Sequence, residues 1–414
     1  MIDRITNGSP SSNLYTDVVN KFKIIAEFFT QNYKADLDQQ FIGLLTGRAG
    51  SIVLHSLLYE STKDPIYIRE INDGCEYILN HLNDSTEISV AYASGLAGIG
   101  WTFIYLKDNN FIDFHVEEIL EEIDFILHRE LNQFLAKKEY DILYNALGIG
   151  MYFVKRKDIE EVERIVRHLY RAMDISDNEF RYSRFDHNES KVFIYDFGLA
   201  HGMAGALHFL GKAFNLGAES ELSKKLIEGL FAFYCHNMQD AQKVGSYFPG
   251  IIPVSKYQSG TNLSQLSRVA WCYGDLGIAH SLYMASLCLN NTQMQSLSLE
   301  ILLFAAQKRE FKSVMVSDPG FCHGSSGNAI MFLNLYHLTS KAEFQEAAEH
   351  YISLTNRYGN KCNDPIESYI TLKERLGSLQ STALLTGIGG PLLAFLYYLD
   401  RNINTDWKEI FFLK

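Results

Sequence analysis

A short glycine element, G-x-x-G, recurs along this chain of 414 residues. Its first position is occupied by Gly47, Gly95, Asn145 (in a degenerate copy), Gly202, Gly274, Gly324 and Gly387. Each copy opens a nearly uncharged apolar segment of helical length, which predicts a helix buried on all sides. Longer charged stretches with helical spacing, such as residues 159–173, lie between the copies and predict half-exposed helices. The glycines would let the buried helices approach closely and adopt positive φ.

Seven buried and seven half-exposed helices are expected to form one domain over residues 1–414, because repeats bury their faces only against neighbours. Neither terminal buried helix has the polar cap of an open solenoid, so the pattern predicts an all-α fold, a closed α/α toroid. Two insertions, near 174–193 and 240–266, mix aromatic, turn-forming and β-branched residues and predict small strands. The first insertion could hold a peptide or be a solvated loop.

Composition excludes several classes of protein. Hydrophobic residues make up 47% of the chain and charged residues 21%, which is ordinary for a globular core. The net charge is −12 and no basic stripe is present, which argues against nucleic-acid binding. Six cysteines and a polar N-terminus without a signal peptide favour a reducing cytoplasm. The uncharged run 376–399 is interrupted by glycines and a proline, and we interpret it as a loop and a buried helix.

The residues just before each glycine differ between copies. Thr46, Ser94 and Thr386 carry hydroxyls where a helix N-cap is expected. In two adjacent copies the corresponding segments are Cys272-Tyr273 and Cys322-His323.

Cys272, Cys322 and His323 offer two thiolates and one imidazole, one ligand short of tetrahedral zinc. Such an open set is typical of a catalytic zinc site, although two small buried cysteines and a capping histidine would give the same pattern. The remaining cysteines lie outside this register and are interpreted as packing residues. They are Cys75, Cys235, Cys288 and Cys362.

His201 occupies the register of His323 but follows Ala200, so it is a candidate acid or base rather than a ligand. A helix-capping role is the alternative. Tyr273 shares this register, Arg268 lies four residues before Cys272, and Asp141 lies four before Asn145. Arg268 could pair with Asp141 or hold a developing anion.

The segments 198–202 (Gly-Leu-Ala-His-Gly), 271–274 (Trp-Cys-Tyr-Gly) and 322–324 (Cys-His-Gly), in this order and spacing, resemble the lanthionine synthetase C-like (LanC) family. The likeness covers nearly the whole chain. It departs from the family at Asn145, where glycine is usual; asparagine tolerates positive φ, so the turn can survive.

The resemblance implies an α/α toroid with one Zn²⁺ per chain, bound by Cys272, Cys322 and His323. It implies a lanthipeptide cyclase that adds cysteine thiols of a dehydrated precursor peptide to dehydroalanine or dehydrobutyrine, giving thioether rings. His201 would transfer a proton, with Asp141, Arg268 and Tyr273 as further catalytic-site residues.

Two alternatives remain open: a LanC-like protein that adds glutathione to dehydrated peptides, and a non-catalytic peptide-binding toroid. A zinc prenyltransferase-like barrel is a third reading, but its toroid has six helix pairs. A dehydratase and an ABC transporter are candidate partners, which would place the protein at the inner face of the membrane.

Overall fold

The computed structural model describes residues 13–34, 41–84, 88–187, 190–260, 264–360, 369 and 382–414. The chain contains two compact units. The first combines Met1–Asp124 with Ser317–Phe411, and the second combines Phe125–Val316 with Phe412–Lys414. Both units are built from alternating buried and half-exposed helices, as the sequence pattern predicts.

Seven helices in the described ranges are buried almost throughout, and each follows one glycine loop. They are α2 (Arg48–Thr62), α4 (Leu96–Asp108), α6 (Ala146–Arg156), α8 (Met203–Leu216), α12 (Asp275–Leu289), α15 (Ser325–Thr339) and α19 (Gly389–Leu399). Their apolar composition on all faces explains why both sides of each helix pack against protein.

Seven amphipathic helices alternate with these in the described ranges and bury one face each. They are α1 (Asn13–Asn32), α3 (Pro65–Asp84), α5 (Glu117–Lys137), α7 (Ile159–Ala172), α9 (Ser220–His236), α13 (Thr292–Gln307) and α16 (Ala342–Tyr358). In α7 the buried side chains are Val162, Ile165, Val166 and Leu169, which recur at helical spacing. The sequence prediction of seven buried and seven amphipathic helices is confirmed in the described part of the chain.

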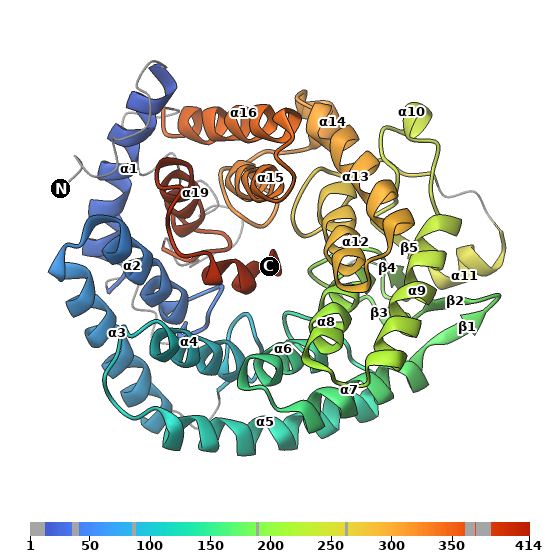
Figure 1. Cartoon of the computed structure of the whole chain (residues 1–414), viewed down its shortest axis with the longest axis horizontal. Coiled ribbons are helices and arrows are strands. Elements are labelled where there is room, and N and C mark those ends of the chain that lie inside the picture. Colours follow the sequence, from blue (N-terminus) through green and yellow to red (C-terminus); the bar gives the residue numbers. More distant parts are fainter. Residues whose placement is uncertain are drawn as a thin grey trace. The chain divides into compact units, whose positions relative to one another are not determined.

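Within each unit, a buried helix contacts the next buried helix and an amphipathic partner. In the first unit, α2 packs against α3, α4 and α19, while α15 packs against α16 and α19 (Figure 1). In the second unit, α8 packs against α6, α9 and α12, while α12 packs against α13. The glycine loops are therefore neighbours wherever their helices are neighbours.

The two insertions contain strands, as expected, and they also share a sheet. Strands β1 (Asp174–Ser176) and β2 (Glu179–Arg181) form a hairpin. Strands β3 (Arg184–Phe185) and β4 (Phe193–Asp196) pair with β5 (Ile251–Pro253) from the second insertion, in the antiparallel order β3-β4-β5. The other short elements among the described residues are α10 (Ala241–Val244), α11 (Val254–Gln258), α14 (Phe311–Val314) and the 3-10 helix η1 (Asp406–Phe411).

The N-caps differ from the prediction. Five of the six glycines at the first position of the repeat are themselves N-caps, and the sixth, Gly387, lies two residues before α19. The hydroxyls of Thr46 and Ser94 therefore do not cap the helices that follow them. The Thr46 hydroxyl instead donates to the Ala93 carbonyl at 3.4 Å, and the Ser94 hydroxyl lies 3.4 Å from that of Ser89. Thr386 is no cap either, because α19 begins at Gly389.

At the glycine N-caps other than Gly274, the reason for glycine is steric rather than conformational. Among the glycine N-caps, Gly274 alone has positive φ, at 88°. At Gly95 a β-carbon would collide with the carbonyl oxygen of Ser89, six residues earlier. Asn145 has φ −127°, so its tolerance of positive φ is not needed.

No helix among the described residues has the length and apolarity that a membrane crossing requires.

Candidate active site and metal ligands

Main-chain hydrogen bonds join neighbouring glycine loops at the residue two places before the glycine. In the second unit, Ala200 N–H donates to the carbonyl of Cys272 at 3.2 Å. In the first unit, Cys322 donates to Leu385 at 3.0 Å, Leu385 to Leu45 at 3.1 Å, and Leu45 to Ala93 at 2.8 Å. These bonds use no side chain, so the side chains at this position are available for other roles.

His201 and Asp141 form a close pair in the second unit. His201 Nδ1 lies 2.7 Å from Asp141 Oδ2, and Tyr144 stacks on the imidazole with ring centroids 5.8 Å apart. Asp141 Oδ1 accepts N–H groups from Leu143 and Tyr144, at 2.7 and 3.0 Å, which fixes the carboxylate. Burial lowers the pKa of His201, but the hydrogen bond and charge of Asp141 outweigh burial and raise it above the ordinary value. With Nδ1 on Asp141, Nε2 is the nitrogen that can exchange a proton with a substrate.

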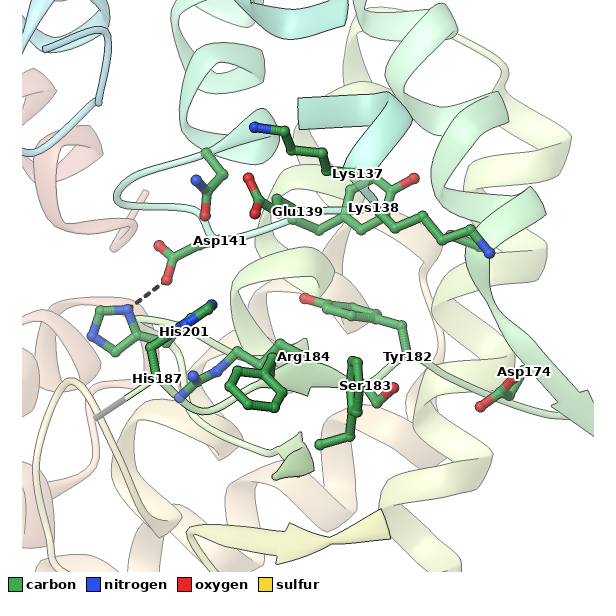
Figure 2. A pocket seen from close by; sticks show the side chains of 15 residues that line it. Lys137, Lys138, Glu139, Asp141, Asp174, Tyr182, Ser183, Arg184, His187 and His201 are labelled. Carbon is green, nitrogen blue, oxygen red and sulfur yellow. Dashed lines mark hydrogen bonds and ion pairs between the residues drawn. The ribbon is translucent and has the colours of Figure 1, made fainter. Parts of the chain in front are cut away.

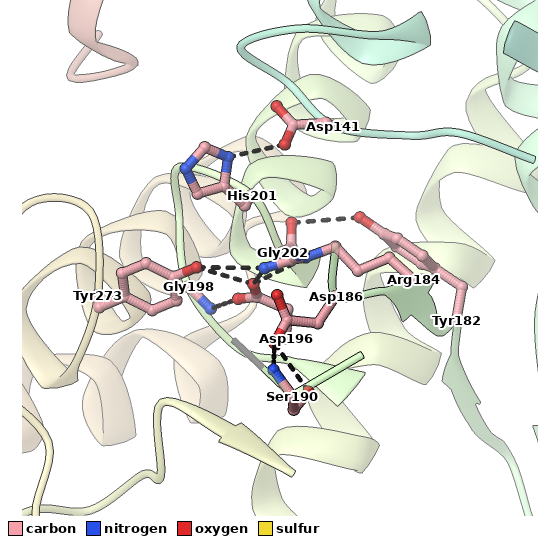
Figure 3. A network of polar contacts seen from close by, with 10 residues as sticks. All are labelled: Asp141, Tyr182, Arg184, Asp186, Ser190, Asp196, Gly198, His201, Gly202 and Tyr273. Atoms are coloured by element: carbon pink, nitrogen blue, oxygen red, sulfur yellow. Dashed lines mark hydrogen bonds and ion pairs between the residues drawn. The ribbon is translucent and has the colours of Figure 1, made fainter. Parts of the chain in front are cut away.

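Tyr273 lies next to His201, with ring centroids 6.2 Å apart. Its hydroxyl donates to Asp196 Oδ2 at 2.9 Å, and Arg184 donates to the same oxygen through Nε at 3.0 Å and Nη2 at 2.6 Å (Figure 3). Burial, followed by the charge of Asp196, raises the pKa of Tyr273, so this phenol stays protonated. The structure thus brings together three of the predicted residues: His201, Asp141 and Tyr273.

A cavity of about 610 Å³ opens beside the His201–Asp141 pair. His201, Asp141 and Arg184 line it with Tyr182 and Phe185, and Lys137 and Lys138 lie at another side (Figure 2). Acidic, basic and aromatic side chains therefore face one space next to a histidine that can transfer a proton.

Arg268 is half-buried and lies six residues before Gly274. Its side chain does not line this cavity and is not the arginine that contacts Asp196 and Tyr273. The Asp141 carboxylate faces His201, so the expected Arg268–Asp141 pair is not the arrangement of this site. A catalytic role for Arg268 stays a prediction.

Sequence reasoning missed Arg184 and Asp196. A signal for Asp196 exists, because the glycine loops before α8 and α15 both have aspartate six residues and glycine four residues before the repeat glycine. Arg184 has no comparable signal, since its place depends on strand pairing within the insertion.

The predicted metal ligands lie in two loops, and in each loop the aromatic residue before the cysteine stacks on a phenylalanine near the C-terminus. Cys272, in the second unit, is buried, and its neighbour Trp271 stacks with Phe412 at 6.2 Å between ring centroids. Cys322, in the first unit, is half-buried, and its neighbour Phe321 stacks with Phe411 at 3.7 Å. In each loop the residue before the cysteine is therefore packed against an aromatic side chain near the C-terminus.

His323 has a carboxylate partner within its own loop. Its Nε2 lies 3.4 Å from Asp318 Oδ2, and Asp318 Oδ1 accepts the Gly320 N–H at 2.8 Å. Metal-bound histidines commonly have such a carboxylate on the second ring nitrogen. Cys272, Cys322 and His323 together could hold a metal ion, and two thiols with one imidazole are ligands that suit zinc.

The other cysteines fit the packing interpretation where they are described. Cys75 is buried in α3, while Cys235 and Cys288 are half-buried in α9 and α12. Burial raises the pKa of the Cys75 thiol to about 12, which disfavours a thiolate there. Cys362 lies outside the described residues.

In the described part of the chain, seven buried helices alternate with seven amphipathic ones, and each buried helix follows a glycine loop. This pattern is that of the α/α toroid class. The chain belongs to the lanthionine synthetase C-like family, whose family model matches residues 40–412. It is 23% identical over 422 residues to the nisin biosynthesis protein NisC of Lactococcus lactis subsp. lactis, covering 95% of this chain and 94% of that protein.

A solved structure of nisin cyclase is similar to the chain, with TM-score 0.76 and 21% sequence identity. The match covers 95% of this chain and 97% of the other. The α/α toroid predicted from the repeat is therefore confirmed as the fold.

Proposed function

We propose that this protein is a zinc-dependent lanthipeptide cyclase. It adds cysteine thiols of a dehydrated precursor peptide to dehydroalanine or dehydrobutyrine, forming lanthionine or methyllanthionine rings. The observation that carries the proposal is the His201–Asp141 pair beside a polar cavity, in a chain of the LanC-like family. The names of the similar proteins, nisin cyclase and NisC, support the same activity.

The addition balances without an oxidant. The thiol releases one proton to solvent, the sulfur bonds to the β-carbon as the Cα=Cβ double bond opens, and the α-carbon of the resulting enolate takes up one proton, so that no atom is gained or lost overall. Nε2 of His201 delivers that proton, while Asp141 fixes the ring and stabilises its protonated form.

Cys272, Cys322 and His323 are proposed to hold the zinc, with Asp318 orienting His323. Bound zinc lowers the pKa of a coordinated thiol, so that a thiolate is present at neutral pH.

We infer further that the whole chain acts as a single catalytic domain. We also propose that the protein acts in the cytoplasm, with a dehydratase and an ABC transporter as its partners. Co-purification of the tagged protein with a dehydratase would support the partner assignment.

The activity is tested with a synthetic peptide that carries one cysteine and one dehydroalanine. Zinc content is measured on the same preparation, and free thiol is titrated as the thioether forms. We expect about one zinc per chain and loss of thiol without change of peptide mass. Glutathione supplied with a cysteine-free dehydrated peptide is the control. Reaction in this control alone would show the glutathione-transferring alternative, and reaction in neither would favour the peptide-binding toroid.

A further inference from the structure

The small sheet β3-β4-β5 brings the side chains of Arg184 and Asp196 together next to Tyr273. Strand β3 pairs with β4 so that Arg184 lies opposite Ile194. Side chains two residues apart on a strand share a face, so Asp196 is the diagonal neighbour of Arg184. The register Asp196↔Ile251 ties this end of β4 to β5 from the second insertion.

Both oxygens of Asp196 are committed. Oδ1 accepts the Gly198 N–H at 2.8 Å, and Oδ2 accepts from Arg184 and Tyr273 (Figure 3). The carboxylate side chain is only 2% exposed, whereas Arg184 is 29% exposed. A buried carboxylate with this many donors has one orientation, because breaking any bond leaves a buried polar group unsatisfied.

The Tyr273 ring has little freedom. Its hydroxyl donates to Asp196 and lies 3.4 Å from Arg184 Nη2. The ring lies against Gly198, where a β-carbon would come within 2.7 Å of Tyr273 Cδ1. His201 is a further neighbour of this ring, and the two rings are tilted by 47° with centroids 6.2 Å apart. A hydroxyl that already donates to Asp196 is not free to protonate an enolate.

We propose that Arg184 and Asp196 are positioning residues, which clamp the Tyr273 hydroxyl and thereby set the orientation of the His201 imidazole. Tyr273 in turn positions His201 and is not the proton donor. The two insertions then contribute to catalysis by delivering this clamp. The catalytic consequence rests on the proposed cyclase function, whereas the effect on His201 does not.

The test is a double-mutant cycle with Asp196→Asn and Tyr273→Phe. Tyr273→Phe keeps the Arg184–Asp196 ion pair, so it reports on the hydroxyl even where Asp196→Asn weakens the fold. The first readout is the ring-proton NMR signal of His201 in histidine-labelled protein, at a pH where the imidazole is neutral; His201→Gln assigns it among the 13 histidines. The second readout is thioether formation with the cysteine–dehydroalanine peptide.

Each single variant, and Arg184→Gln, should displace the His201 signal and slow thioether formation about 10- to 100-fold, the range for a misplaced catalytic group. Combining Asp196→Asn with Tyr273→Phe should stay within about twofold of the more affected single variant, because both act through one hydroxyl. Asp186→Asn is the matched control: Asp186 accepts from Ser190 N and Oγ, both at 2.7 Å, in the same insertion. It should leave the His201 signal unmoved.

Multiplicative losses in the double variant, or an unmoved His201 signal in Asp196→Asn, would overturn the clamp. A wild-type protein that forms no thioether would reject the cyclase function, and the NMR cycle would still decide the positioning role.

Discussion

The glycine loops before α8 and α15 use one framework for two purposes. In each, aspartate six residues before the glycine accepts an N–H group two residues further on: Asp196 from Gly198 and Asp318 from Gly320, both at 2.8 Å. The second oxygen makes the difference. Asp318 faces the histidine of its own loop, His323, at 3.4 Å.

Asp196 instead accepts from Arg184 and Tyr273, and the histidine of its loop, His201, turns to Asp141. The residue before the histidine also differs between the two loops: it is Cys322 before His323 and Ala200 before His201. One loop therefore has a cysteine and a histidine, the proposed metal ligands, with a carboxylate beside the histidine, and the other has the proposed general acid, His201, with a carboxylate from a neighbouring loop. The comparison teaches that where the aspartate of the loop bonds other groups, as Asp196 does, the histidine of that loop takes its carboxylate from elsewhere.

The largest effect is expected for Cys322→Ala in the α15 loop. Zinc should fall from about one per chain to near zero, and thioether formation should be lost, because two ligands do not retain a catalytic zinc. Metal analysis and thiol titration measure both, and circular dichroism should show an intact fold. Cys235→Ala, on a half-buried cysteine outside the register, is the control and should keep its zinc. Full zinc occupancy in Cys322→Ala would move the metal elsewhere.

His201→Ala in the α8 loop should separate zinc binding from chemistry. Zinc should stay at the wild-type level, while thioether formation should slow about 100-fold or more, as for loss of a positioned acid. Zinc, melting temperature and ring formation are measured on one preparation. Normal cyclisation at full zinc occupancy would remove His201 from the mechanism, and loss of zinc would erase the distinction between the two loops.

Asp318→Asn should weaken zinc binding about 10- to 100-fold, the usual effect of removing a carboxylate that orients a ligand. The amide oxygen can still accept the Gly320 N–H, so the turn should persist. Competition with a chromogenic chelator measures the affinity. Asp196→Asn is the matched variant in the other loop, and equal loss of zinc affinity in both would contradict the assignment of separate roles.

Asp141→Asn should change how stability depends on pH. Since Asp141 raises the pKa of His201 against the effect of burial, protonated His201 stabilises the fold below its unfolded pKa of about 6.5 and loses that contribution as pH rises through the folded value. The deficit of the variant in free energy of unfolding should therefore be largest at about pH 5.5 and shrink as pH rises. Urea denaturation across this range measures it, with Asp186→Asn as control. A deficit that is constant with pH would mean that Asp141 acts only through its bonds to Leu143 and Tyr144.

The sequence predicts the helices well because burial on all sides leaves a local record in each repeat. His201 and Tyr273 could be placed together because they share a register, and Asp141 because it precedes the neighbouring copy. Arg184 could not, since its contact with Asp196 depends on the pairing of two short strands. The N-cap prediction failed because glycine itself takes the cap, where the close carbonyl excludes a side chain.

The main-chain bonds between neighbouring loops have a consequence for evolution. Ala200 and Cys322 both donate through the backbone to the next loop, and Leu385 and Leu45 do the same. The hydrogen bonds between loops therefore do not depend on the side chain two residues before the glycine. A metal-ligating side chain can be gained or lost there by a single substitution while these main-chain bonds persist. Duplicated copies of one helix pair could diverge in this way, some keeping a plain apolar residue and others acquiring reactive chemistry.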